Sequence, residues 1–222
     1  MDIAYILQKI AIYAVPLVLA ITLHEAAHAY VARYFGDDTA ALLGRVTLNP
    51  LKHIDPIGTI AMPAFLYIVT HGAFSLGYAK PVPVRVRRLR NPRRDMIWVA
   101  LAGPACNLAQ ALLWGVLLTL LHGIGVNEPF FFSVCITGVI VNLILFAFNL
   151  FPLPPLDGGR ILVGLLPPQA AMTISRVEPW GIFIVLALVA TNVINRWWMD
   201  PLINVTVYLL MTLLPPLKAL LA

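Results

Sequence analysis

Two histidines and a glutamate stand close together in an apolar stretch near the start of the sequence. Residues 22–30 contain His24, Glu25 and His28 in the spacing HExxH. On a helix, residues four apart share a face one turn from each other, so both imidazoles can bind one zinc ion. Glu25 then lies beside the metal, where a carboxylate can act as general base. Each ionisable group in such an apolar helix costs about 3 kcal/mol, so three within five residues indicate a metal site.

A catalytic zinc site takes three protein ligands and keeps a fourth position for water. Asp157 is the best candidate for the third ligand, because it follows the proline-rich residues 152–156 and precedes Gly158. Prolines and glycines do not continue a helix, so we expect Asp157 on unwound backbone at membrane depth. The alternative is that Asp157 is a helix N-cap, a position that Asp often occupies.

The other acidic residues are weaker candidates for a metal ligand. Asp37 and Asp38 follow the end of the first apolar run and are expected to be solvated. The remaining ones fall at the boundaries of apolar segments, as capping or interfacial charges do: Asp95, Glu128, Glu178 and Asp200.

Composition places the chain in a membrane. Of its 222 residues 60% are hydrophobic and 11% charged, and the mean hydropathy is +0.87. Six arginines in one loop, at 85–94, account for most of the net charge of +5. Such a loop next to apolar segments is explained by membrane topology, so nucleic acid is not expected as a partner. Cys106 and Cys135 lie in apolar runs and are expected to be packing residues.

The apolar runs predict an all-α polytopic membrane protein with about five transmembrane helices. They cover residues 3–35, 96–121, 130–151, 180–198 and 202–217. The insertion after the first helix is turn-rich, with a short strand predicted at 44–48 and a stretch at 57–70 that crosses or re-enters. The basic loop predicts a cytoplasmic side, on which Asp157 and both histidines then have to lie.

Three sequence elements together resemble the site-2 protease family of intramembrane zinc metalloproteases. These are the HExxH motif at 24–28, the stretch AGPACN at 102–107, and NLFPLPPLDG at 149–158. The resemblance covers about residues 15–165 and is to the compact form without a PDZ or CBS domain. It implies one zinc ion per chain, held by His24, His28 and Asp157, with Glu25 as general base.

The resemblance also defines the expected organisation and site. We expect a single integral-membrane metalloprotease domain over 1–222, with a catalytic core at about 15–165 and C-terminal helices at about 180–221. Asn149 is the first candidate for the donor that stabilises the developing oxyanion, and Asn107 the second. For either asparagine, an interhelical hydrogen bond is the alternative. His53 lies in a turn, where an interfacial role is favoured over one in the site.

The function implied is intramembrane proteolysis. The expected partners are the lipid bilayer and a membrane-embedded polypeptide, cut near the cytoplasmic side of the plasma membrane of a prokaryote. An extended substrate could add as a strand to residues 79–84 or 45–48, of which the second has fewer prolines and is the better edge. The alternative is a membrane zinc-binding or transport protein with the same ligands, which the small number of intramembrane acids disfavours.

Overall fold

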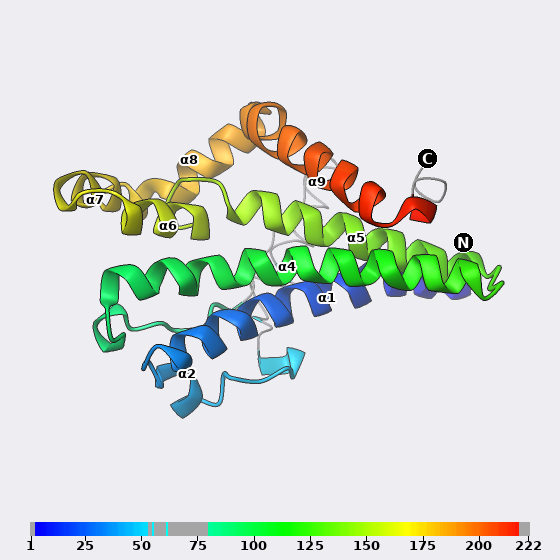
Figure 1. Ribbon diagram of the computed structural model, residues 1–222, viewed down its shortest axis with the longest axis horizontal. Coiled ribbons are helices and arrows are strands. Elements are labelled where there is room, and N and C mark those ends of the chain that lie inside the picture. The colour runs from blue at the N-terminus through cyan, green and yellow to red at the C-terminus, as the bar shows by residue number, and fades with distance from the viewer. Residues whose placement is uncertain (1–2, 53–54, 56–60, 62–79, 218–222) are drawn as a thin grey trace.

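Three long helices form the centre of the protein. The computed structural model describes residues 3–52, 55, 61 and 80–217. Helices α1 (Ile3–Tyr34), α4 (Pro92–Gly123) and α5 (Pro129–Asn149) pack against one another side by side (Figure 1). Their bounds agree with the apolar runs predicted at 3–35, 96–121 and 130–151.

These three helices are long and apolar enough to cross a membrane. A fourth crossing is added if α7 (Pro168–Ser175) and α8 (Glu178–Ala190), which meet at a bend of 66°, count as one span. Large apolar side chains such as Leu113, Ile140 and Phe183 point outward and are half or more exposed, as suits a face in contact with lipid. The all-α membrane fold is therefore supported, but only three or four of the five predicted spans are found in the described part.

The predicted continuous helix over 180–198 is wrong. Helix α8 ends at Ala190, and after a turn the π-helix η4 (Asn195–Met199) leads into α9 (Asp200–Leu213). At the break Asn192 has a φ of +59°, a left-handed conformation that Asn tolerates better than most residues. Hydropathy falls at this break, where Asn192, Asn195 and Arg196 follow the apolar residues 181–190, so the predicted run extends too far.

The insertion after α1 contains only short helices in the described residues. These are α2 (Thr39–Leu42), η1 (Pro50–Lys52) and, before α4, η3 (Val86–Arg88). The strand predicted at 44–48 is a series of bends, and no strand occurs in the described ranges, so the β-containing insertion is not confirmed. The stretch at 57–70, except residue 61, lies outside the described residues, as does His53.

Asp157 begins a helix instead of lying on unwound backbone. The chain is non-helical only up to Leu156, and α6 runs from Asp157 to Leu165. A carboxylate in the first turn of a helix is favoured by the exposed N–H groups there. Gly158 permits this turn, because a Cβ at that position would overlap the carbonyl oxygen of Leu150.

The acidic residues predicted at segment boundaries do lie there. Glu128 is the N-cap of α5, and Glu178 and Asp200 are in the first turns of α8 and α9. Asp95, in the first turn of α4, accepts a 2.7 Å hydrogen bond from the N–H of Asn91. These carboxylates stabilise helix starts, as predicted.

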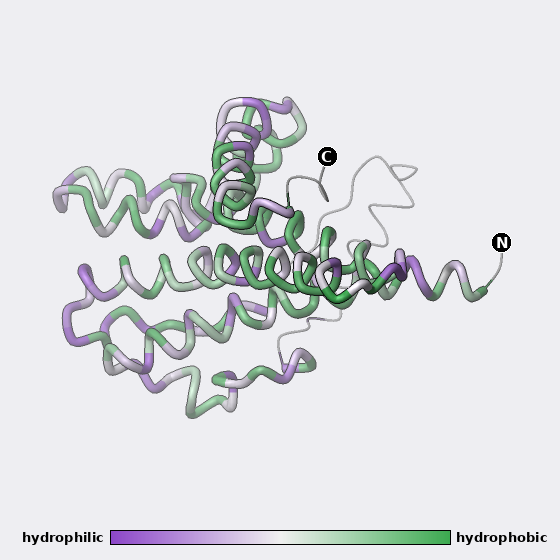
Figure 2. Tube along the Cα trace, turned by 45° about the vertical axis from the view of Figure 1, so that its right-hand side comes forward, coloured by the Kyte–Doolittle hydropathy of each residue, from purple (hydrophilic) through white to green (hydrophobic). Residues whose placement is uncertain are grey.

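A hydrophobic core joins α4, α5 and α9 at one end of the bundle. Its buried members include Leu118, Val139, Leu143 and Leu210, together with Cys135, which is a free thiol as expected. At the opposite end, hydrophilic residues gather where residues 80–91 lead into α4 (Figure 2). Helices α6 and α7 lie at this polar end in Figure 1, so the chain has an apolar body and one markedly basic end.

Candidate metal centre

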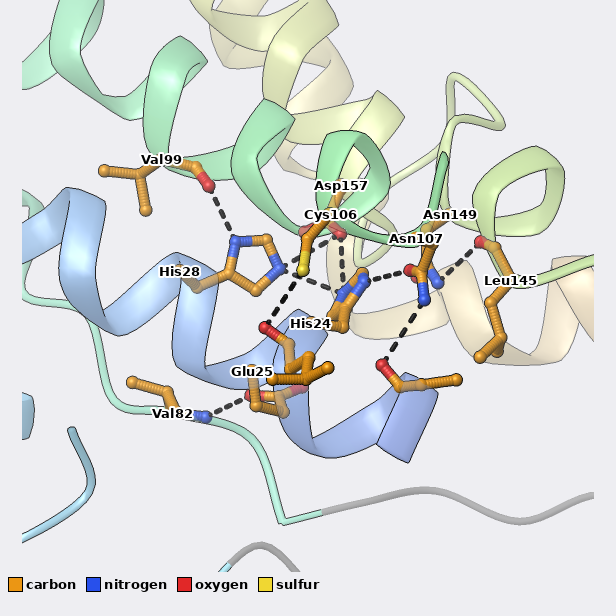
Figure 3. A network of polar contacts seen from close by, with 12 residues as sticks. His24, Glu25, His28, Val82, Val99, Cys106, Asn107, Leu145, Asn149 and Asp157 are labelled. Carbon is orange, nitrogen blue, oxygen red and sulfur yellow. Dashed lines mark hydrogen bonds and ion pairs between the residues drawn. The ribbon is translucent and has the colours of Figure 1, made fainter. Parts of the chain in front are cut away.

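Three acceptor atoms from two helices converge inside the bundle. Nε2 of His24 lies 3.0 Å from Nε2 of His28, and each lies 3.3 Å from Oδ2 of Asp157. All three residues are buried. The structure therefore brings together the two histidines of the HExxH motif on α1 and the aspartate at the start of α6, as Figure 3 shows.

The hydrogen bond made by His28 leaves its Nε2 without a hydrogen when the ring is neutral. Nδ1 of His28 lies 2.6 Å from the carbonyl oxygen of Val99 on α4. A carbonyl oxygen only accepts, so Nδ1 carries the hydrogen and Nε2 presents a lone pair toward Asp157.

A chain of amides sets the same tautomer in His24. Nδ2 of Asn142 donates to the carbonyl of Gly138. This bond fixes the amide of Asn142 with its Oδ1 toward Asn107. Asn107 in turn donates from Nδ2 to Oδ1 of Asn142 and to the carbonyl of Ala20, at 3.0 and 3.3 Å. Its own Oδ1 is left to accept from Nδ1 of His24 at 2.6 Å, so Nε2 of His24 also presents a lone pair.

This arrangement fits a bound cation. Oδ2 of Asp157 is buried and accepts no hydrogen bond from the described residues, while two imidazole lone pairs face it. Three mutually repelling acceptors in an apolar bundle are costly unless a positive ion lies between them. A tetrahedral zinc ion with bonds of about 2.0–2.1 Å would separate its ligands by about 3.3 Å. The separations of 3.0, 3.3 and 3.3 Å in the structure are close to that spacing.

Gly103 on α4 keeps space free beside the two imidazoles. A Cβ at this position would lie 2.6 Å from Nε2 of His24 and would overlap Nε2 of His28. Gly103 is itself buried, so the added atom could not turn away into solvent. One small residue of the AGPACN stretch therefore bounds the candidate metal centre.

Glu25 is held from the side of an extended segment, residues 80–85. Its Oε2 accepts a 2.7 Å hydrogen bond from the N–H of Val82. Figure 3 shows this contact beside His24 and His28. Because Pro81 and Pro83 have no N–H, Val82 supplies the single donor between them. One carboxylate oxygen of Glu25 is thereby fixed, and the other accepts no hydrogen bond from a described residue.

Two further side chains fix the extended segment 80–85. The buried guanidinium of Arg45 donates to the carbonyls of Lys80 and Pro81, at 2.9 and 3.4 Å, and also to that of Lys52. At the other end, Asp37 accepts a 2.6 Å hydrogen bond from the N–H of Arg85. The segment that contacts Glu25 is therefore anchored on both sides of Val82.

Asp37 is not the solvated residue that its position after α1 predicts. It is 0% exposed, whereas Asp38 is exposed and forms a 3.5 Å ion pair with Arg33. Burial alone would raise the pKa of Asp37, but hydrogen bonds from Thr39 and from the Arg85 N–H, with the charge of Arg88, hold that pKa below its ordinary value. Asp37 is thus an ionised anchor for the chain beside the site.

The two asparagines predicted as oxyanion donors have different surroundings. Asn149, at the end of α5, donates from Nδ2 to the carbonyl of Leu145 at 2.9 Å and is half-buried (Figure 3). Asn107 is fully buried, and its amide is used by His24, Asn142 and Ala20. These contacts are the interhelical hydrogen bonds that were the alternative role for Asn107, and they orient His24. Asn149 therefore remains the first candidate for the oxyanion donor.

Several residues around the site are not identified by sequence reasoning. Gly103, Asn142 and Val82 act through neighbours more than 30 residues away in the chain, and Val99 acts through its backbone. Two of them carry a usable signal. Gly103 belongs to the AGPACN stretch, and Asn142 is an amide in an apolar helix, which has to find a polar partner.

Comparison with known proteins gives relatives that the chain matches over most of its length. The chain is 40% identical over 208 residues to "Putative zinc metalloprotease YwhC" of Bacillus subtilis (strain 168), covering 90% of this chain and 89% of the relative. It is 31% identical over 183 residues to "Putative zinc metalloprotease Rip2" of Mycolicibacterium smegmatis, covering 82% and 68%. For Rip2 of Mycobacterium tuberculosis (strain H37Rv) the identity is 30% over 184 residues, covering 81% and 67%. No protein-family model and no solved structure matches the chain.

An HExxH helix, a distant aspartate and an apolar helical bundle define the class of membrane-embedded metal proteins. The similarity to YwhC over nine-tenths of the chain makes the assignment narrower. The chain belongs to the site-2 protease family of zinc metalloproteases, as its motifs predict.

Proposed function

We propose that this protein is a zinc-dependent endopeptidase that cuts a peptide bond in or near a transmembrane segment of another protein. The observation that carries the proposal is the buried triangle of His24, His28 and Asp157 with Glu25 beside it, inside helices of membrane-spanning length. The names of the related proteins as zinc metalloproteases support it.

The ligands and the general base have separate tasks. His24, His28 and Asp157 would hold one zinc ion, which when bound supplies Lewis acidity that polarises the scissile carbonyl and eases deprotonation of a water molecule. Glu25 would take the proton with the carboxylate oxygen that Val82 leaves free, and then return it to the leaving amine. Asn149 is our candidate for the donor to the developing oxyanion.

The extended segment 80–85 is our proposed substrate-binding edge. A helical substrate has to unfold locally before its peptide bonds can be attacked, and strand addition would hold it extended. The edge that the sequence favours, 45–48, is bent, whereas 80–85 is extended, anchored at both ends and in contact with Glu25. Because Pro81 and Pro83 lack N–H groups, pairing along this edge would be short.

We further propose that the site faces the cytoplasm in a multi-pass plasma-membrane protein. Residues 85–94, with six arginines, lead into α4 at the end of the bundle where hydrophilic residues gather (Figure 2), and α6 lies at this end in Figure 1. Basic residues next to transmembrane helices favour the cytoplasmic side. The substrate would then be cut close to that side of the bilayer.

Cleavage by the purified protein in proteoliposomes tests this function. A panel of single-span membrane substrates is incubated with zinc-loaded wild type, with Glu25→Gln, and with Glu128→Gln, which removes an exposed carboxylate at the start of α5, as a control. We expect wild type and the control to cut, and Glu25→Gln to lose at least about 100-fold in rate while keeping one zinc ion per chain. A chelator should stop cleavage, and added zinc should restore it.

The same experiment separates the protease from an ion-site or transport protein. If zinc-loaded wild type cuts no substrate in the panel, but Glu25→Gln changes zinc flux into vesicles, the protease proposal is wrong. Equal cleavage by wild type and Glu25→Gln would instead remove Glu25 from the role of general base.

A further inference from the structure

A groove of about 760 Å³ opens beside the metal centre at the polar end of the bundle. Its walls come from residues 81–86, the first turn of α4, and helices α6 and α7. Most of the lining is apolar, including Val82, Val84, Met96 and Val163. An extended polypeptide is the kind of ligand that fits a groove of this size and lining.

The groove adjoins the candidate active site. Val82 lines it and also donates to Oε2 of Glu25, so one wall of the groove contacts the proposed general base. Pro154 lines it from the loop that leads to Asp157. A polypeptide whose scissile bond lies at the metal centre would therefore continue into this groove.

Arg160 lines the groove without a side-chain partner among the described residues. It lies three residues after Asp157 on α6, on the same side of the helix, and is half-buried. Its guanidinium makes no hydrogen bond or ion pair with any residue in the described ranges. By contrast, Arg93 donates from Nε to the carbonyl of Gly164 at 2.9 Å and from Nη2 to that of Leu166. A half-buried, unpaired guanidinium gains most when a carboxylate meets it.

The charge around the groove favours one acidic residue rather than an acidic run. Arg85, Arg87 and Arg88 lie in or next to the segment that forms one wall and add positive potential. Glu178, in the first turn of α8, also lines the groove and would repel a second carboxylate nearby. The complementary ligand is thus an apolar segment with a single Asp or Glu close to Arg160.

We infer that Arg160 is a specificity-determining residue that selects substrates with an acidic side chain beside the scissile bond. Three residues of α6 span about 4.5 Å along the helix, and an extended chain rises about 3.3 Å per residue. The acidic residue should therefore lie within about three positions of the cut bond, on the part of the substrate that enters the groove. This inference rests on the proposed proteolytic function and adds the substrate feature to it.

A scan of substrate charge tests the inference. A single-span substrate that wild type cuts is made with Asp, Asn or Lys at each of the four positions on either side of the cut. Wild type, Arg160→Gln and Arg160→Glu are compared in vesicles of zwitterionic lipid. For wild type we expect kcat/KM to be about tenfold higher with Asp than with Asn at one or two positions. In Arg160→Gln this ratio should fall to near one, and in Arg160→Glu the Lys substrate should become the better one.

Control variants and lipids make the result specific. Arg176→Gln, which removes an exposed arginine at the end of α7 outside the groove, should keep the tenfold ratio. Zinc content and thermal unfolding show that each variant is folded, and the charge-reversed pair tests the contact even if Arg160→Gln is unstable.

Repeating the scan with anionic lipid shows whether Arg160 instead binds a lipid headgroup. If Arg160 binds a headgroup, its loss would change how the cleavage rate depends on anionic lipid and would leave the Asp-to-Asn ratio unchanged. That result overturns the inference.

Each outcome bears on one proposal. If wild type cuts Asp, Asn and Lys substrates equally, or if Arg160→Gln keeps the preference, the inference about Arg160 is overturned while proteolysis stands. If wild type cuts no substrate at all, the proposed function fails first.

Discussion

Oδ1 of Asn107 lies 2.6 Å from Nδ1 of His24, although 83 residues separate them in the sequence. Both amide hydrogens of Asn107 are directed to other acceptors, the carbonyl of Ala20 and the side chain of Asn142. The amide can therefore only accept from the imidazole, which turns Nε2 of His24 toward Asp157. An uncharged contact between α1 and α4 thus sets the tautomer and the orientation of a candidate metal ligand.

Asn107→Ala should weaken zinc binding. Without the amide, His24 loses the partner that fixes its tautomer, and we expect zinc affinity to fall by about 10–100-fold. Competition with a chromophoric chelator measures this affinity. Asn127→Ala, in the exposed turn between α4 and α5, is the control and should bind zinc like wild type. Unchanged affinity in Asn107→Ala would show that the contact does not orient the ligand.

Gly103→Ala should remove zinc binding more completely. The added methyl group would lie 2.6 Å from Nε2 of His24 and would overlap His28, so the imidazoles have to move apart. We expect the folded variant to contain little zinc and to lose cleavage activity by at least about 100-fold. Gly123→Ala, at the end of the same helix with no atom within 4 Å of the added Cβ, is the matched control. A zinc-loaded, active Gly103→Ala would contradict the close approach of Gly103 to both imidazoles.

Asp37 should make stability depend on pH in the acidic range. Its pKa in the folded protein lies below the ordinary value of about 3.9, so the ionised form stabilises the fold. That stabilisation is complete above about pH 5 and is lost as the pH falls through the unfolded-state pKa toward the lower folded-state pKa.

Replacing Asp37 with asparagine tests this dependence. At about pH 6 we expect Asp37→Asn to lose about 1–3 kcal/mol, because Asp37 accepts hydrogen bonds from Arg85 and Thr39. The difference from wild type, measured by thermal unfolding, should shrink between about pH 5 and pH 3. Asp38→Asn is the matched control and should change stability little, since the ion pair of Asp38 with Arg33 is exposed. A difference that stays constant with pH would show that Asp37 is not ionised in the folded protein.

The sequence predicts the parts of this protein that depend on local pattern. The apolar runs give α1, α4 and α5 nearly to their ends, because hydropathy over about 20 residues determines which helices can lie in a membrane. Helical spacing places His24 and His28 on one face, and the proline-rich stretch marks the loop before Asp157.

The parts that it does not predict depend on contacts across space. Asp37 is buried because Arg85, 48 residues later, returns to it, and Gly103 matters because α4 crosses α1 at the histidines. Neither contact leaves a mark in the neighbouring sequence. The break after Ala190 is a different case, since Asn192, Asn195 and Arg196 lower the hydropathy there and the run predicted at 180–198 extends across them.

The most direct test of the metal centre is the zinc content and X-ray absorption spectrum of the purified wild type, compared with Asp157→Ala. We predict one zinc ion per chain in wild type, bound by two imidazoles and a carboxylate oxygen at about 2.0–2.2 Å. Asp157→Ala should lose most of that zinc, whereas Asp200→Ala, which removes an exposed carboxylate on α9, should keep it. If Asp157→Ala kept a full zinc ion with an unchanged spectrum, Asp157 would not be a ligand and the centre formed by His24, His28 and Asp157 would be wrong.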